Sequence, residues 1–277
     1  MNTWFRDVIK RQGWTDFIKR AYKMSEYHGI LSDKFIASLK RFTAVIERYD
    51  AYCTFPMVAS VAARHKETTQ IIIDGGHEVA SHGFIHVRFD NFSYNEQLRM
   101  LRLSLKVLEE LIGCKIIGLR TPYQLYNENT FNAIVDAGFY YDSSIYSSKP
   151  KAPYPMMARG RKFIEIPWTL SEVTLIDVQK VSPSELLKIW LEVLKGCKMS
   201  DVVTLDAHPV RIGTTGYIEV LDNLLYYARN NGFKITSLGE VYEMFMRKKI
   251  SMPMLALSGD IDCFRLVDYL LRLWGKA

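Results

Sequence analysis

Short apolar runs alternate with amphipathic stretches along most of the chain. Between residues 93 and 112, five leucines recur at helical spacing behind Ser93, which predicts a helix with that serine as its N-cap. Gly138 predicts the end of a second helix, over residues 127–137. Similar patterns predict helices at 184–195, 217–230, 238–247 and 264–274. Apolar runs predict strands at 51–55, 78–81, 116–119, 163–167, 202–205, 233–235 and 254–257.

This alternation of strands and helices is typical of an α/β protein with repeated β/α units around a mainly parallel sheet. About seven strands with helices between them favour a closed or nearly closed barrel, although an open doubly wound sheet would give a similar pattern. Before the first strand, the pattern predicts only helical segments, at 4–10, 14–23 and 33–49. No repeat or linker divides the chain, so we expect a single domain over 1–277. It would comprise a helical part (1–50), the main barrel (51–250) and a final β/α unit (251–277).

Composition narrows the classes of protein. No apolar run approaches the roughly 18 residues that a membrane-spanning helix needs, so we expect no transmembrane segment. The N-terminus lacks the apolar core of a secretory signal, which predicts a cytoplasmic location. The net charge of +6 is spread along the chain, so we expect no nucleic-acid partner, while a homo-oligomer stays open. Cys53, Cys114, Cys197 and Cys263 lie far apart, which predicts buried free thiols.

His82 and His86 are the first candidate metal ligands. Two imidazoles four residues apart on a helical turn can reach one ion from the same face. Such a pair needs a third ligand, usually a carboxylate, and open positions for chemistry. The zinc-protease motif has Glu after its first His, and this chain has Gly83 there, which argues against a protease.

Three motifs follow predicted strands in a fixed order. They are HGFIH at 82–86, RTPY at 120–123 and LDAHP at 205–209, accompanied by GHEVASH at 76–82 and AGFYYDSS at 137–144. In this order they resemble the metal-dependent polysaccharide deacetylases of the NodB-homology family, also called carbohydrate esterase family 4. The resemblance covers about residues 50 to 245 and implies a distorted β/α barrel.

The family's opening strand, which ends in an Asp-x-Asp motif, is absent from its usual place. The segment 25–29, which contains His28, has neither aspartate. An apolar run ending in Asp260 and Asp262 follows at the far end of the chain, and we interpret this as a circular permutation that moves the first β/α unit to the C-terminus. Two alternatives stay open. The two aspartates could belong to an ordinary solvated turn, or the tail could complete a neighbouring subunit's barrel.

The resemblance implies a role for each motif residue. Asp262, His82 and His86 would hold one divalent metal ion, with zinc first and cobalt, nickel, manganese or iron as alternatives. Asp260 would be the general base and His208 the general acid. Arg120 would orient the base, and the backbone N–H of Tyr123 would complete an oxyanion site. Asp206, Glu165 and Asp142 are candidate partners of His208 or Arg120.

The implied activity is hydrolysis of a carbon–nitrogen bond other than a peptide bond. We expect removal of an acetyl or formyl group from an N-acylated amino sugar. The alternatives are a hydrolase of small linear or cyclic amides and a catalytically silent carbohydrate-binding relative. Trp168, Tyr126 and Tyr146 could form a sugar platform, with core packing as the competing interpretation. We expect His28, His65 and His77 to be surface or structural residues.

Overall fold

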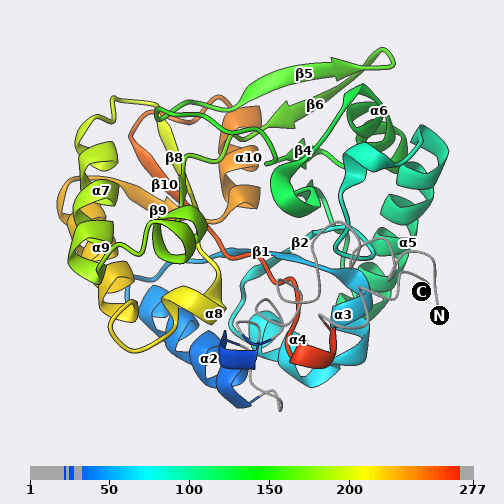
Figure 1. Ribbon diagram of the computed structural model, residues 1–277. Helices are drawn as coiled ribbons and strands as arrows, with labels where there is room; N and C mark the ends of the chain where they lie inside the picture. The colour runs from blue at the N-terminus through cyan, green and yellow to red at the C-terminus, as the bar shows by residue number, and fades with distance from the viewer. Residues whose placement is uncertain (1–21, 23–24, 28–32, 269–277) are drawn as a thin grey trace.

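A sheet of ten strands forms the centre of the molecule in the computed structural model, which describes residues 22, 25–27 and 33–268 (Figure 1). The strands follow the order β5-β6-β4-β3-β2-β1-β10-β8-β7, and β9 also pairs with β10. Each pair is parallel except β5 with β6. The strands are β1 (Thr54–Met57), β2 (Glu78–Ser81), β3 (Gly118–Leu119), β4 (Tyr141–Asp142), β5 (Tyr154–Ala158), β6 (Arg161–Glu165), β7 (Leu170–Ser171), β8 (Val202–Asp206), β9 (Lys234–Thr236) and β10 (Met254–Ser258).

The sheet curls because the segment that runs from β6 to β7 pairs with strands toward both ends of the sheet. β6 pairs with β4, and β7, which follows it directly, pairs with β8. Between them, the amide of Ile166 donates to Asp142 and the amide of Thr169 donates to Thr204. The predicted distorted β/α barrel is therefore confirmed as the fold class. β4, β5 and β7 were not predicted, because β4 and β7 have only two residues each and β5 is an antiparallel edge strand.

The predicted helices between the strands are confirmed, with shifts of a residue at their ends. Ser93 and Glu96 form a capping box on α5, and Gly113 ends that helix in the left-handed conformation, with φ of 76°. Figure 1 shows α5 and α6 on one side of the molecule and α7 and α9 on the other. The helices are α2 (Asp33–Glu47), α3 (Ala59–Arg64), α4 (Lys66–Asp74), α5 (Tyr94–Ile112), α6 (Glu128–Ala137), α7 (Pro183–Lys195), α8 (Pro209–Ile212), α9 (Ile218–Asn230) and α10 (Leu238–Met246), with short turns η1 (Phe89–Asn91), η2 (Pro122–Gln124) and the π-helix η3 (Val173–Val178).

Several predictions differ from these elements. The short helices α3 and α4 were not predicted, and α4 contains a run of β-branched residues with low helix propensity. The predicted helix 33–49 corresponds to α2, whereas 4–10, nearly all of 14–23 and the end of 264–274 lie outside the described residues. The four cysteines are free, but Cys114 is exposed and Cys197 half-buried, so the expectation of burial was wrong for these two. No helix in the described part of the chain is long and apolar enough to cross a membrane.

The C-terminal strand β10 lies inside the sheet of its own chain. It pairs with β8 along its length, with β9 at Met254–Ala256, and with β1 at Ser258. The bridge between Met57 and Ile261 then continues the pairing with β1 beyond the end of β10. The residues that follow β10 therefore lie beside those that follow β1 and β2. The circular permutation itself stays a prediction.

Candidate metal centre and active site

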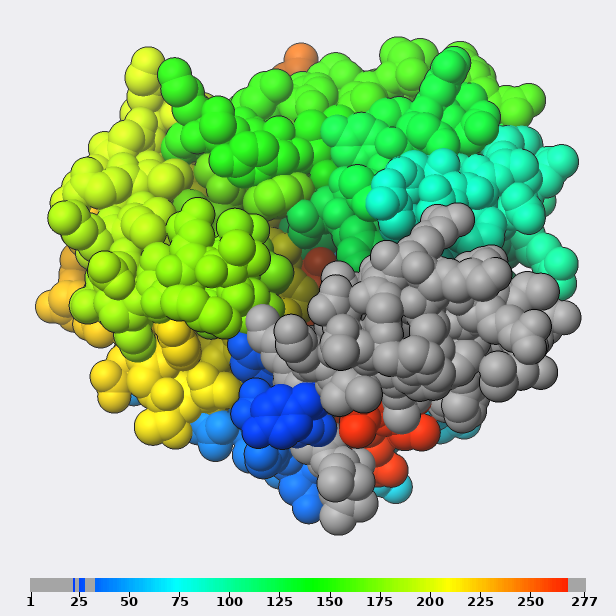
Figure 2. Space-filling view, viewed as in Figure 1, coloured from blue at the N-terminus to red at the C-terminus, as the bar shows by residue number. Residues whose placement is uncertain are grey.

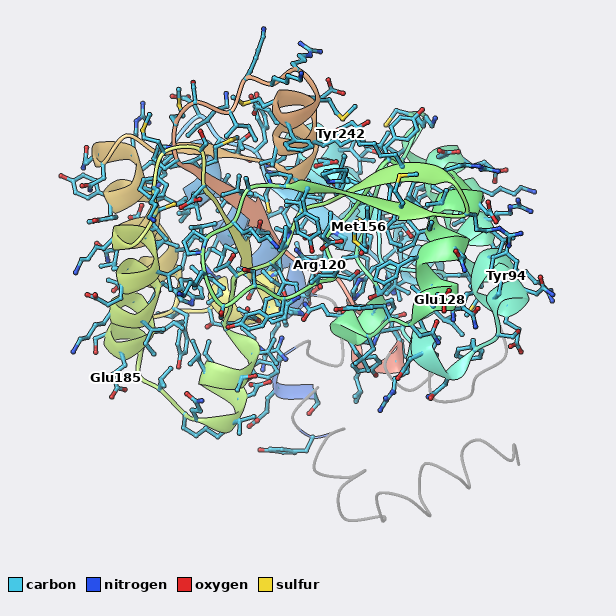
Figure 3. The ribbon with its side chains drawn as sticks, turned by 90° about the horizontal axis from the view of Figure 1, so that it is seen from above. Tyr94, Arg120, Glu128, Met156, Glu185 and Tyr242 are labelled. Carbon is cyan, nitrogen blue, oxygen red and sulfur yellow. The ribbon has the colours of Figure 1, made fainter. Side chains whose placement is uncertain are left out.

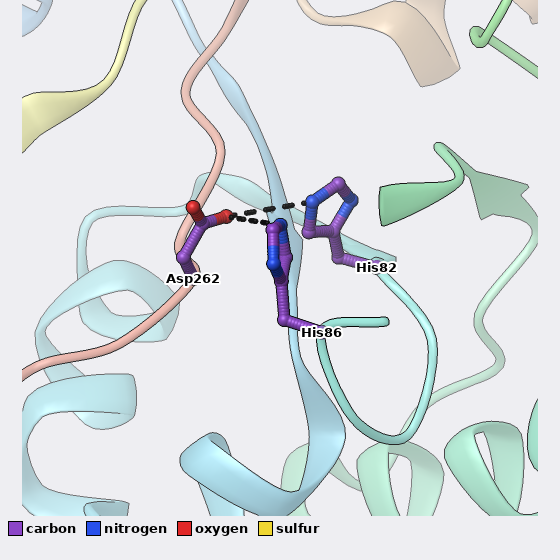
Figure 4. A group of neighbouring side chains, drawn as sticks. All are labelled: His82, His86 and Asp262. Atoms are coloured by element: carbon purple, nitrogen blue, oxygen red, sulfur yellow. Dashed lines mark ion pairs between the residues drawn. The ribbon is translucent and has the colours of Figure 1, made fainter. Parts of the chain in front are cut away.

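His82, His86 and Asp262 meet at the carboxyl ends of the central strands (Figure 4). Oδ1 of Asp262 lies 3.5 Å from Nε2 of His82 and 3.1 Å from Nε2 of His86. The strand β1 aligns the two segments that carry them, because Met57 accepts a hydrogen bond from the amide of His82 and Pro56 accepts one from the amide of Ile261. The arrangement brings together residues about 180 positions apart in sequence.

The two histidines lie in a loop, so the expectation that they share a helical turn was wrong. Gly83 adopts φ of 77°, and a Cβ there would lie 3.1 Å from the ring of Phe89. The carbonyl groups of Gly83 and Phe84 accept hydrogen bonds from the first turn of α3, which holds the loop in place. The left-handed residue reverses the chain, so both imidazoles face Asp262 without helical geometry.

The donor set fits a divalent metal ion. The three ligand atoms lie within 4.8 Å of one another, and Oδ1 of Asp262 is buried with no hydrogen bond of normal geometry among the described residues. Nδ1 of His82 lies 2.8 Å from the carbonyl oxygen of Arg120, which leaves Nε2 directed toward the carboxylate. Burial alone would raise the pKa of Asp262, but His86 and His82 hold it well below its usual range. An ionised carboxylate with two imidazole nitrogens is a typical zinc donor set.

Arg120 is fully buried and holds the second aspartate. Its Nη1 donates to Asp260 at 2.8 Å, to Asp206 at 3.0 Å and to the hydroxyl of Ser258 at 2.8 Å. The rest of the guanidinium donates to Ser143. Burial raises the pKa of Asp260 to about 6, against the opposing charge of Arg120. Arg120 lies near the middle of the molecule when it is viewed from above (Figure 3).

His208 follows β8 on the other side of Asp260. Its Nδ1 lies 2.9 Å from Oε1 of Glu172, and its backbone amide donates to the same oxygen at 3.2 Å. Burial would lower the pKa of His208, but the charges of Glu172 and Asp206 outweigh it and raise the pKa to about 10. The histidine is therefore an imidazolium at neutral pH.

Glu172 was not among the candidates named from the sequence. It follows the two-residue strand β7, whose pairing with β8 places it beside His208. Of the three candidates, Asp206 contacts Arg120, whereas Asp142 and Glu165 form a buried carboxyl pair away from His208. The available signal was a carboxylate five residues after the end of the predicted strand 163–167, and this signal is weak without knowledge of the strand order.

Asp268 fixes the segment that follows Asp262. Its carboxylate accepts a hydrogen bond from the amide of Phe264 at 3.1 Å and lies 3.0 Å from Nε2 of His65 and 3.1 Å from Nε of Arg64. The side chain is buried, and the contacts to His65 and Arg64 hold its pKa below the usual range although burial opposes this. The loop with the third metal ligand is thus fastened to the end of α3.

Three histidines outside the metal centre were expected to be surface or structural residues. His77 is buried, accepts a hydrogen bond from the amide of Cys53 through Nδ1, and has a pKa that burial lowers to about 4. It is therefore structural, as is His65, whose side chain is 9% exposed. His28 lies outside the described residues.

The aromatic residues divide into two groups. Tyr146 and Trp168 pack with ring centroids 4.6 Å apart and line the same cavity as the histidines, whereas Tyr126 packs on Phe131 and does not line it. The ring of Tyr123 lies 4.3 Å from that of His86, and its backbone has φ of 60°. The role assigned to its N–H stays a prediction.

The candidate site faces a cavity of about 830 Å³. Its lining includes the three candidate metal ligands together with Asp260 and His208. This volume lies in the range of small-molecule sites.

Comparisons with known proteins agree with this architecture. Residues 33–141 match the polysaccharide deacetylase family model. A peptidoglycan deacetylase-like protein of Gibberella zeae is 30% identical over 77 residues (28% of this chain, 23% of that protein), and the peptidoglycan deacetylase of Helicobacter pylori is 22% identical over 186 residues (56% and 64%). The chain thus covers less than two thirds of either relative.

The fold extends beyond the matched sequence. A crystal structure assigned as a polysaccharide deacetylase from Mycobacterium smegmatis covers 90% of this chain and 89% of its own, with a TM-score of 0.71 and 20% identity. The chain therefore contains a polysaccharide deacetylase domain of the NodB, or carbohydrate esterase 4, type.

Proposed function

We propose that the protein is a metal-dependent hydrolase that removes an acetyl or formyl group from an N-acylated amino sugar. The observation that carries the proposal is the meeting of His82, His86 and Asp262 beside Asp260 within one cavity. The deacetylase family match supports hydrolysis of a carbon–nitrogen bond other than a peptide bond. A sugar ring would stack on Tyr146 at the cavity wall, since aromatic faces pack well on apolar sugar faces.

His82, His86 and Asp262 would hold the ion, and we propose zinc because imidazole and carboxylate donors suit it. When bound, such an ion polarises a carbonyl group and makes a water molecule more acidic. Arg120 contributes indirectly, because its carbonyl oxygen fixes the orientation of the His82 ring.

Asp260 would accept the proton of the attacking water. Arg120 binds its Oδ1, while its Oδ2 lies 3.8 Å from Nε2 of His82 and so faces the metal ligands. With its pKa raised to about 6, the carboxylate is ionised at neutral pH yet more basic than a solvated aspartate.

His208 would protonate the departing amine. Glu172 engages its Nδ1, so Nε2 is the atom that would give up the proton. A pKa near 10 keeps this proton in place at neutral pH. The backbone N–H of Tyr123 would contact the substrate's carbonyl oxygen as negative charge develops there.

The test is acetate release from N-acetylglucosamine and its oligomers, and formate release from N-formylglucosamine, by zinc-loaded protein. We expect Asp260→Asn and His82→Ala to lose activity by about 100-fold or more, since the first removes the proposed base and the second removes a proposed metal ligand. Zinc binding, measured by titration calorimetry, should fail in His82→Ala and persist in Asp260→Asn.

Asp222→Asn is the matched control. Asp222 pairs with Arg48 and Tyr49 and does not line the cavity. Its variant should keep full activity, and circular dichroism should show that all three variants fold. Release that is unchanged in Asp260→Asn would refute the assigned roles, and wild-type protein that neither binds zinc nor releases acid would refute the function.

A further inference from the structure

The cavity has a polar end and an apolar wall. The polar end holds the candidate metal ligands with Asp260 and His208. The apolar wall, as we call it, consists of six side chains from the segment after β6 and from α7: Leu170, Val173, Leu175, Ile189, Trp190 and Val193. Polar residues of the same segment also line the cavity between them, namely Thr169, Ser171, Thr174 and Asp177. The space-filling view shows a hollow beside the lime-coloured segment, with the red C-terminal segment deep within it (Figure 2).

The apolar wall is fixed in place beside the proposed acid. Glu172, which begins η3, binds His208. At the other end of η3, Asp177 accepts two hydrogen bonds from Arg211, at 2.9 and 3.2 Å, and one from Tyr27 at 2.6 Å. The η3 part of the wall is therefore held at one end by Glu172, which also contacts the proposed acid, and at the other end by Arg211.

The apolar wall leaves a large side chain in contact with solvent. Ile189 is 38% exposed although it lines the cavity. Apolar surface that gathers at a concave site, rather than scattering singly, marks a place where an apolar ligand group is buried. The cavity of about 830 Å³ is also larger than one acetylated sugar ring requires.

We propose that the substrate carries an aliphatic or aromatic substituent next to its N-acylated sugar, and that this substituent packs against the apolar wall. The inference rests on the proposed function and narrows its substrate class. A chain of apolar atoms would displace water from Ile189 and Val193 while the amide reaches the metal ligands. The substituent can come from either side of the amide, as a longer acyl group or as the group attached to the sugar.

Two substrate series separate these sources. The first varies the acyl group, from N-acetyl through N-butanoyl to N-octanoyl glucosamine. The second varies the sugar's attachment, from methyl to octyl N-acetylglucosaminide. Since each buried methylene contributes about 0.8 kcal/mol, burying even two of them lowers KM by about tenfold or more. We expect this decrease in one of the two series.

Ile189→Asn tests the apolar wall directly. We expect this variant to reduce the factor by which KM falls from the shortest to the longest compound of the responsive series. Leu103→Asn is the control, because Leu103 is equally exposed, at 37%, but lies on α5 outside the cavity. It should keep the full decrease in KM.

Calorimetric binding separates failure of this inference from failure of the proposed function. Tighter binding of the longest than of the shortest compound of the responsive series to wild-type protein, lost in Ile189→Asn, supports the apolar wall even if no acid is released. Equal KM and equal affinity across both series would overturn the inference while leaving the deacetylase function intact.

Discussion

Replacing Arg120 with methionine should destabilise the protein by about 3 to 5 kcal/mol. The guanidinium is fully buried and donates from one nitrogen to both Asp206 and Asp260, which are 1% and 4% exposed. Methionine fills a similar space without a charge, so it leaves two neighbouring carboxylates without their cation. Removal of one partner from a buried ion pair typically costs about this much, because the remaining charge stays buried and uncompensated.

The measurement is urea unfolding at pH 7, followed by circular dichroism, with the free energy of unfolding extrapolated to zero denaturant. The double variant Arg120→Met with Asp206→Asn should regain part of the loss, because it removes one of the uncompensated charges. The deficit should also shrink as pH falls toward 5, since Asp260, whose pKa burial raises to about 6, then binds a proton that the unfolded chain does not. A loss under about 1 kcal/mol, or no recovery in the double variant, would refute the idea that Arg120 is the charge partner of both aspartates.

Three other predictions follow from the site. Glu172→Gln should move the alkaline limit of activity to lower pH, because the acid must stay protonated and His208 would lose a carboxylate whose charge opposes the effect of burial on its pKa. Measurement of kcat/KM between pH 6 and 11 checks this prediction, and an unmoved limit would exclude Glu172 as the cause of the raised pKa. Asp268→Asn should weaken zinc affinity by about 10- to 100-fold, as substitutions of residues that orient metal ligands typically do, and higher zinc should restore activity. Calorimetry checks this prediction, and an unchanged affinity would mean that Asp268 does not position Asp262. Zinc at about 100 times its dissociation constant should stabilise metal-free protein by about 2.7 kcal/mol, and a melting temperature that ignores zinc and chelator alike would count against the metal centre.

The sequence by itself determined the elements whose pattern is local. The leucine spacing behind Ser93 predicted α5, because helical periodicity and capping act within a few residues. The strands β1, β2, β8 and β10, which have four or five residues each and parallel neighbours on both sides, were all predicted from their apolar runs. The residue types of the site were also visible, since His82 and His86 share one motif and Asp260 and Asp262 another.

Tertiary structure alone decided which of these motifs meet, and how. The insertion of β10 between β8 and β1 brought the aspartates to the histidines, and the two-residue strand β7 brought Glu172 to His208. The loop geometry at Gly83 depended on contacts with α3 and the ring of Phe89. Hydrophobic periodicity indicates which side of a segment is buried, but it does not indicate which strand will pair with that segment. Strand order follows from packing the whole chain, and that order placed the carboxylates beside the imidazoles.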